Sequence, residues 1–223
     1  MRVKYSLIVL TAILSILLGC IFLIKFTQQN ESHPRLIPDQ VMTVLVDPKP
    51  LREFFLVDHQ NHEFNLSTLN GKWSFLFFGF IQCPDICPTT LVSLSKIRSQ
   101  ITKEIIAPEQ TQFIFISVDP KRDTAQMLKQ YTNYFDSSFI GVTGTEAELH
   151  NLANQLDVTF NLQYKPNQSD YEVIHTSAVF LINPQGQYQV LITPPFDIET
   201  ISRRFSILKK IDTLNLTKID KPL

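Results

Sequence analysis

The sequence predicts an α/β domain with a central mixed sheet flanked by helices. Short apolar runs of strand length alternate along the chain with longer segments whose apolar residues recur at helical spacing. Two of these runs, Trp73–Phe80 and Gln112–Val118, are almost wholly apolar, as expected of strands that are buried on both faces. Because strands and helices alternate, the helices are expected to cover both faces of the sheet.

The individual elements follow from these patterns in chain order. Strands are expected at Phe54–Val57, Trp73–Phe80, Gln112–Val118, Phe139–Val142, Ser177–Ile182 and Tyr188–Ile192. Helices are expected at Thr89–Ile105, Thr124–Tyr134, Glu146–Leu156 and Ile198–Ile211. Pro88 suits the first turn of the first helix, and Thr145 with Glu148 forms the capping-box pattern that opens the third. Residues 51–215 are therefore expected to form one domain, followed by a short tail at 216–223.

The amino-terminal segment has the character of a membrane anchor. Residues 6–24 carry no charge and approach the roughly 20 residues that a spanning helix needs. The residues up to Cys20 also resemble a lipobox, in which this cysteine would be lipidated, but the apolar residues 21–24 extend the run and favour a spanning helix. More positive charges precede the run than directly follow it, which places the domain outside the bacterial inner (cytoplasmic) membrane, on the periplasmic or extracytoplasmic side. We expect a single-pass anchor in residues 1–25 and a polar, proline-bearing tether in residues 26–50.

Composition excludes several classes of protein. The chain has 20 Lys and Arg against 21 Asp and Glu, a net charge of −1, so it lacks the basic field by which nucleic-acid-binding proteins attract phosphate. Of its three cysteines, Cys20 lies in the apolar amino-terminal run, so only Cys83 and Cys87 can form a pair in the domain. A disulfide-stapled scaffold is therefore excluded, and nucleic acid is not the expected partner.

The two cysteines lie in the stretch FGFIQCPDICPTTL, between an expected strand and an expected helix. Ligands gather at the carboxyl ends of strands in such folds, so an ordered and exposed site is expected here. A helix amino terminus favours anionic sulfur, which predicts a lowered pKa for Cys87. Asp85, between the cysteines, opposes thiolate formation unless a cation is bound. The pair is expected to act as a nucleophile or as metal ligands; an inert disulfide or two buried thiols are the less favoured alternatives.

The choice of metal depends on a third ligand. Structural zinc takes four nitrogen or sulfur ligands, and a second pair at short spacing is missing. Two thiolates and one imidazole instead suit copper. Among the five histidines, His175 is the best candidate, because it follows the expected loop Gln163–Glu172 and immediately precedes a strand.

Three separated motifs resemble one known family. FGFIQCPDICPTTL, FISVDPKRDT and IHTSAVFLINPQG, behind an amino-terminal anchor, are similar to the motifs of the Sco/SenC family, the copper proteins of cytochrome c oxidase assembly. The resemblance covers the chain from about Leu51 to the last helix. It implies a thioredoxin-like fold that binds copper through Cys83, Cys87 and His175.

The second motif adds further residues to this resemblance. Asp119 matches an acidic position that the family uses near the site, although a turn role beside Pro120 explains it equally well. Arg122 and Asp123 are expected to make a local ion pair and a helix cap. In the first motif, Gln82 replaces a histidine that relatives often have, which removes none of the three ligands.

Two functions remain open at this point. The leading hypothesis is a membrane-tethered copper metallochaperone that receives copper from an upstream donor. The resemblance implies delivery to the binuclear copper (CuA) centre of a cytochrome c oxidase subunit. The alternative is a thiol–disulfide oxidoreductase, in which Cys83 and Cys87 form a redox pair that keeps the cysteines of the oxidase copper site reduced. Peroxiredoxin chemistry is disfavoured because Phe80 stands where that family has threonine, and a pure interaction module would leave the cysteines unexplained.

Overall fold

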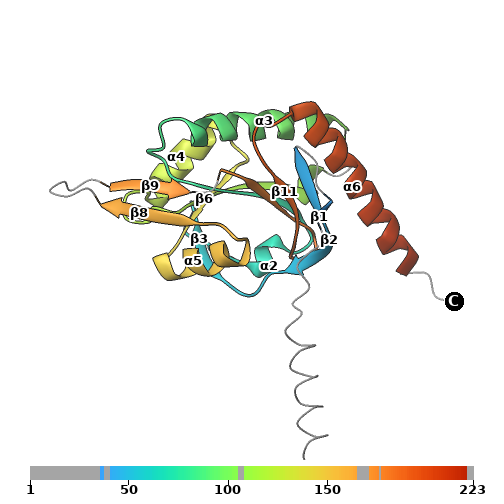
Figure 1. Ribbon diagram of the computed structural model, residues 1–223, viewed down its shortest axis with the longest axis horizontal. Helices are drawn as coiled ribbons and strands as arrows, with labels where there is room; N and C mark the ends of the chain where they lie inside the picture. Colours follow the sequence, from blue (N-terminus) through green and yellow to red (C-terminus); the bar gives the residue numbers. More distant parts are fainter. Residues whose placement is uncertain (1–35, 38–40, 105–107, 165–170, 176, 220–223) are drawn as a thin grey trace, which may run out of the picture. The chain divides into compact units, whose positions relative to one another are not determined.

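The computed structural model describes residues 36–37, 41–104, 108–164, 171–175 and 177–219 (Figure 1). For residues 36–37, 104, 108, 162–164, 171–175 and 213–219 the description is limited to the backbone. Leu36–Leu223 form one compact unit, and the expected anchor with Cys20 lies outside the described residues. Within the described ranges, no helix combines the length and the hydropathy of a bilayer-spanning segment.

The described residues contain a nine-stranded mixed sheet in the order β1-β2-β11-β10-β5-β6-β7-β3-β4. Its strands are β1 Leu36–Ile37, β2 Met42–Pro50, β3 Phe55–Asp58, β4 Glu63–Asn65, β5 Trp73–Gly79, β6 Thr111–Ser117, β7 Ile140–Thr143, β10 Val179–Ile182 and β11 Gln187–Ile192. The pairs β5–β6 and β6–β7 are parallel, and the other pairs are antiparallel. A separate two-stranded sheet consists of β8 Phe160–Tyr164 and β9 Tyr171–His175. The prediction of a central mixed sheet is confirmed.

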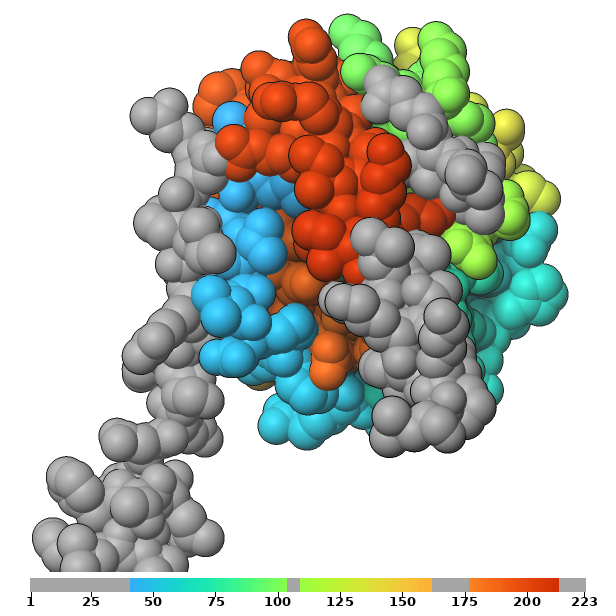
Figure 2. All heavy atoms as spheres, turned by 90° about the vertical axis from the view of Figure 1, so that its right-hand side faces the viewer, coloured from blue at the N-terminus to red at the C-terminus, as the bar shows by residue number. Residues whose placement is uncertain are grey.

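Helices cover both faces of the main sheet, as the alternation of elements predicts. They are α2 Leu66–Leu69, α3 Ile86–Glu104, α4 Ala125–Phe135, α5 Glu146–Gln155 and α6 Ile198–Ile219, with a short 3-10 turn at Pro108–Gln110. Figure 1 shows α3 and α4 along one side of the sheet and α2 and α5 along the other. The last helix, α6, packs against α3 and lies beside β2 at the edge of the molecule (Figures 1 and 2).

Aromatic side chains fill the core around the central strand β5. All seven residues of this strand are buried, as its apolar sequence predicts. Phe75 stacks on Phe113 of β6 with ring centroids 4.6 Å apart, and Trp73 meets Phe205 of α6 edge-on at 5.7 Å. These contacts attach α6 to the sheet through large buried rings, which contribute more than their area alone.

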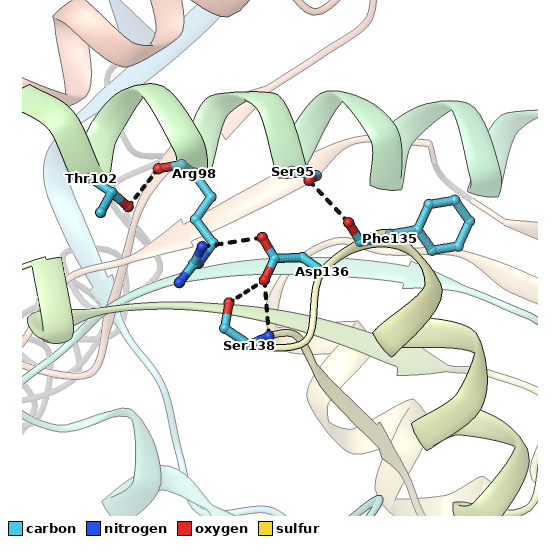
Figure 3. A network of polar contacts seen from close by, with 6 residues as sticks. All are labelled: Ser95, Arg98, Thr102, Phe135, Asp136 and Ser138. Atoms are coloured by element: carbon cyan, nitrogen blue, oxygen red, sulfur yellow. Dashed lines mark hydrogen bonds and ion pairs between the residues drawn. The ribbon is translucent and has the colours of Figure 1, made fainter.

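A polar network joins α3 to the end of α4 (Figure 3). The Arg98 guanidinium lies 3.2 Å from the Asp136 carboxylate, and the Ser95 hydroxyl donates to the carbonyl of Phe135 at 3.1 Å. The backbone N–H and hydroxyl of Ser138 donate to the other carboxylate oxygen of Asp136. The network supplies hydrogen-bond and charge partners to Phe135 and Asp136 at the carboxyl end of α4, and so fixes the position of this helix beside α3.

Two parts of the chain differ from the sequence expectation. Met42–Pro50, which lies in the expected tether, forms β2 and pairs with β11, so the sheet begins before the expected domain boundary at residue 51. The expected loop Gln163–Glu172 includes the end of β8 and the start of β9, and residues 165–170 between them lie outside the described ranges. The hairpin therefore carries His175 as the last residue of a strand.

Candidate metal centre

The cysteine turn lies where two parallel strands end at the same edge of the sheet. Gly79, the last residue of β5, is in register with Ser117, the last residue of β6. The carbonyl of Gly79 accepts a hydrogen bond from the N–H of Val118 at 2.9 Å. The connections that follow β5 and β6 therefore start side by side, so the first and second sequence motifs meet in space.

The two cysteines are thiols placed one helical turn apart. Cys83 lies in the turn before α3 and Cys87 in the first turn of that helix, and no disulfide joins them. The backbone N–H of Cys87 donates to the sulfur of Cys83 at 3.4 Å. Their position is as predicted, but their exposure is not, because Cys83 is 8% and Cys87 0% exposed. The two sulfurs are therefore close together and largely shielded from water.

Gly79 makes room for the buried Cys87 sulfur. A Cβ atom at this position would lie 2.7 Å from the Cys87 Sγ and 2.7 Å from Cε2 of Phe115. Both distances are shorter than real Cβ contacts. The sulfur and the Phe115 ring thus converge on the space above the end of β5, which only glycine leaves open.

Burial controls the protonation of Cys87. Removal from water raises the pKa of this thiol well above its usual range, and the neighbouring Cys83 and Asp123 raise it further. A hydrogen bond from the backbone of Phe80 acts in the opposite direction but is the smaller effect. The prediction of a lowered pKa, based on the helix terminus, is therefore wrong for the metal-free protein. A bound cation would reverse the balance by favouring the thiolate.

Asp123 joins the cysteine turn to the connection after β6. Its carboxylate oxygen Oδ2 accepts from the backbone N–H of Ile81 at 3.0 Å and from the Ser117 hydroxyl at 2.6 Å. The other oxygen, Oδ1, is buried and has no hydrogen-bond partner. Burial raises the pKa of this carboxyl. The expected capping role is wrong, because Thr124 caps α4 by accepting from the N–H of Met127.

The two other acidic candidates have different surroundings. Asp119 is fully buried and pairs with the Nε of Arg122, so the expected ion pair involves this aspartate and not Asp123. Its backbone N–H donates to the Ser117 hydroxyl at 3.1 Å, which places it in the same network as Asp123. Asp85 is exposed in the turn, where its carbonyl accepts from the N–H and the hydroxyl of Thr89. Both residues thus make local contacts, and their predicted place near a bound metal stays a prediction.

Sequence reasoning missed the importance of Asp123. Ser117 was the available signal, because it is a polar residue at the buried end of an otherwise apolar strand and therefore needs a partner. Asp123 supplies that partner and also holds the backbone of the cysteine turn.

His175 ends β9, and its side chain lies outside the described atoms. Its backbone is paired with Phe160 at the base of the β8–β9 hairpin. The Phe160 ring is 9% exposed and stacks on the imidazole of His150 from α5, with centroids 4.2 Å apart. Among the described side chains, which exclude that of His175, no three His, Cys, Asp or Glu residues are grouped as metal ligands.

Comparison with known proteins identifies the family of this chain. A family model described as SCO1/SenC matches residues 40–209. The chain belongs to the SCO1/SenC family. Like its relatives, this SCO1/SenC protein has a thioredoxin-like mixed sheet with helices.

Solved structures and sequences of SCO1/SenC relatives match most of the chain. Yeast Sco1 with copper bound is 33% identical, with a TM-score of 0.65, and the match covers 74% of this chain and 90% of that one. Arabidopsis thaliana ScoI with copper bound is 30% identical, with a TM-score of 0.64, and the match covers 73% and 98%. A SCO2-like protein of Rickettsia conorii is 30% identical over 191 residues, which are 84% of this chain and 90% of that protein. Copper is therefore bound by relatives that share this fold.

Proposed function

We propose that this SCO1/SenC protein is a membrane-anchored copper metallochaperone. It binds copper through Cys83, Cys87 and His175 and delivers it to the CuA centre of cytochrome c oxidase during assembly. The observation that carries the proposal is the pair of free cysteine thiols beyond the end of β5, where the backbone N–H of Cys87 donates to the Cys83 Sγ at 3.4 Å. Copper-bound relatives with the same fold support the choice of metal.

The chemistry of the site fits a soft cation. Thiolate sulfur is a ligand that copper(I) prefers, and two sulfurs with one imidazole give a low coordination number that this ion accepts. The acidic Asp123, with an unpaired buried oxygen, contributes negative charge near the sulfurs. Negative charge on these buried groups is unfavourable without a counter-charge, and a bound cation supplies that counter-charge.

The three-ligand site explains how copper could pass to an acceptor protein. Each thiol gives up its proton when its sulfur bonds to copper, so copper binding weakens as the solution becomes more acidic. With only three protein ligands, a ligand of the acceptor can bind the metal before a ligand of the donor leaves. Cys83 is the more accessible of the two described ligands and is the expected point of entry.

The proposed setting is the surface of a membrane. Residues 1–25 serve as the anchor, residues after it as the tether, and the domain faces the periplasmic or extracytoplasmic side of a bacterial inner membrane. The proposed partners are an upstream copper donor and the CuA-bearing subunit of the oxidase. Family membership supports the role in oxidase assembly.

Copper titration of the full-length chain tests the proposal. The reduced wild-type protein should bind one copper ion tightly, whereas the oxidised protein and the variants Cys83→Ser, Cys87→Ser and His175→Ala should not. His62→Ala is the matched control, because this histidine is exposed at the distant β3–β4 turn. Wild-type affinity in His175→Ala would show that the three-ligand site is wrong.

A thiol–disulfide oxidoreductase is the second candidate, since the same two thiols are close enough to be oxidised together. It predicts that His175→Ala keeps dithiol exchange with an oxidised substrate at the wild-type rate. The raised pKa of Cys87 favours the chaperone, because a thiol that stays protonated is a poor nucleophile. Exchange that is fast in a variant unable to bind copper would instead favour the oxidoreductase.

A further inference from the structure

Tyr131, on α4, has an unusual orientation. Tyrosines at a protein surface commonly bury the ring and leave the hydroxyl in water. Here the residue as a whole is partly exposed, yet its hydroxyl oxygen is fully buried and has no hydrogen-bond partner. Buried hydroxyl groups in folded proteins are nearly always paired, so the orphaned group needs an explanation.

The surroundings of Tyr131 lead to the cysteine site. Its ring contacts the Phe115 ring, with centroids 5.4 Å apart. Phe115 also borders the space above Gly79 that the Cys87 sulfur occupies. Burial raises the pKa of the Tyr131 phenol, and the titratable groups that raise it further are Cys87, then Cys83, then Asp123. Through Phe115 and through these electrostatic effects, Tyr131 is linked to the candidate metal centre.

We propose that Tyr131 is a positioning residue of this centre, whose hydroxyl donates a hydrogen bond to the Cys87 sulfur when that sulfur becomes a thiolate. The inference deepens the proposed function and rests on it where copper is concerned. A phenol is a donor at neutral pH, and thiolate sulfur is a better acceptor than the thiol that is present without metal. The hydroxyl that lacks a partner in the metal-free protein would thus gain one when copper binds.

Such a bond would affect the metal in two ways. It would hold the Cys87 sulfur in one orientation, as partners of metal ligands commonly do. It would also withdraw electron density from the sulfur, which raises the energy of sulfur-to-copper charge transfer. A residue with only a packing role would change neither property.

The test compares Tyr131→Phe with Tyr134→Phe in the full-length chain. Both variants lose one hydroxyl from the same helix, but Tyr134 is 86% exposed and serves as the control. Copper(I) affinity is measured by competition with a chromophoric chelator, and charge-transfer absorption is measured after loading with copper(II). Tyr131→Phe should bind copper(I) about tenfold more weakly, the effect of one hydrogen bond to a charged acceptor. Its charge-transfer band should move to lower energy, whereas Tyr134→Phe should match the wild type in both measurements.

A third measurement separates this inference from the proposed function. Cadmium(II) also binds cysteine sulfur as the thiolate, so the hydrogen bond should form in the cadmium-loaded protein as well, and Tyr131→Phe should bind cadmium(II) about tenfold more weakly than the wild type. If the wild type binds copper but Tyr131→Phe matches it in copper affinity, spectrum and cadmium affinity, the inference is wrong and the proposed function stands. If the wild type binds no copper, the proposed function fails, and the cadmium affinity alone decides: weaker binding by Tyr131→Phe supports the role of Tyr131, and equal affinities overturn it.

Discussion

Substitution of Gly79 by alanine should disturb the cysteine site by placing a methyl group in the space that the Cys87 sulfur and the Phe115 ring occupy. The added Cβ would lie 2.7 Å from the Cys87 sulfur and from the Phe115 ring, which is 0.7 Å short of the 3.4 Å at which ordinary contact begins. Both neighbours are packed in the core and exposed by at most 1%, so neither can move into solvent. Overpacking of this kind costs about 1–3 kcal/mol. Gly79→Ala should therefore unfold at lower urea concentration and bind copper more weakly.

The double variant Gly79→Ala with Cys87→Ala provides the control. Removing the sulfur relieves one of the two contacts, so the alanine at position 79 should cost less in the Cys87→Ala background than in the wild type. Unfolding free energies from urea titration, monitored by the fluorescence of Trp73, give this difference. Equal costs in the two backgrounds would refute the reasoning that sulfur and methyl group compete for the same space.

Three further changes test other parts of the molecule. Asp123→Ala leaves a buried donor, the Ser117 hydroxyl, and a partly buried one, the Ile81 N–H, without an acceptor. It should cost about 3 kcal/mol in urea unfolding, whereas Asp123→Asn, which keeps an acceptor oxygen, should cost less. His59 accepts a hydrogen bond from the N–H of Gly141, and burial lowers its pKa below the unfolded value of 6.5. Its contribution to stability should therefore be complete above pH 6.5 and decline as the pH falls below that value. Below pH 6.5, the unfolding free energy should change less with pH in His59→Gln than in the wild type. Equal pH dependence in the two proteins would contradict this role of His59. Phe160→Ala removes the ring on which His150 stacks and should weaken copper binding about tenfold by loosening the hairpin base, and unchanged copper affinity would show that the stack does not position the hairpin.

Much of the fold could be predicted from local sequence patterns. The apolar run at β5, the helical pattern from residue 124 to 134 and the capping-box residue Thr145 placed the strand and two helices within a residue or two. In contrast, β2 was missed, because Met42–Pro50 contains two prolines and charged residues that resemble a linker. Its pairing with β11 depends on residues far away in the chain, which local patterns do not contain.

The site was also predicted only where it depends on local sequence patterns. The spacing of Cys83 and Cys87 and the strand-to-helix turn are local features, and they were placed correctly. The burial of Cys87 depends on packing against groups elsewhere in the fold, such as Phe115, so the effect on its pKa was predicted with the wrong sign. Asp123 was missed because the backbone that it holds, at Ile81, lies 42 residues earlier in the chain.

The proposed ligands come from two sheets that share no ladder of hydrogen bonds. Both cysteines follow β5, in the middle of the nine-stranded sheet, whereas His175 ends a strand of the separate β8–β9 pair. A change in the separation of the two sheets would therefore open or close the proposed copper site without breaking any strand pairing. A rigid central sheet is thus compatible with a site that exchanges its cargo.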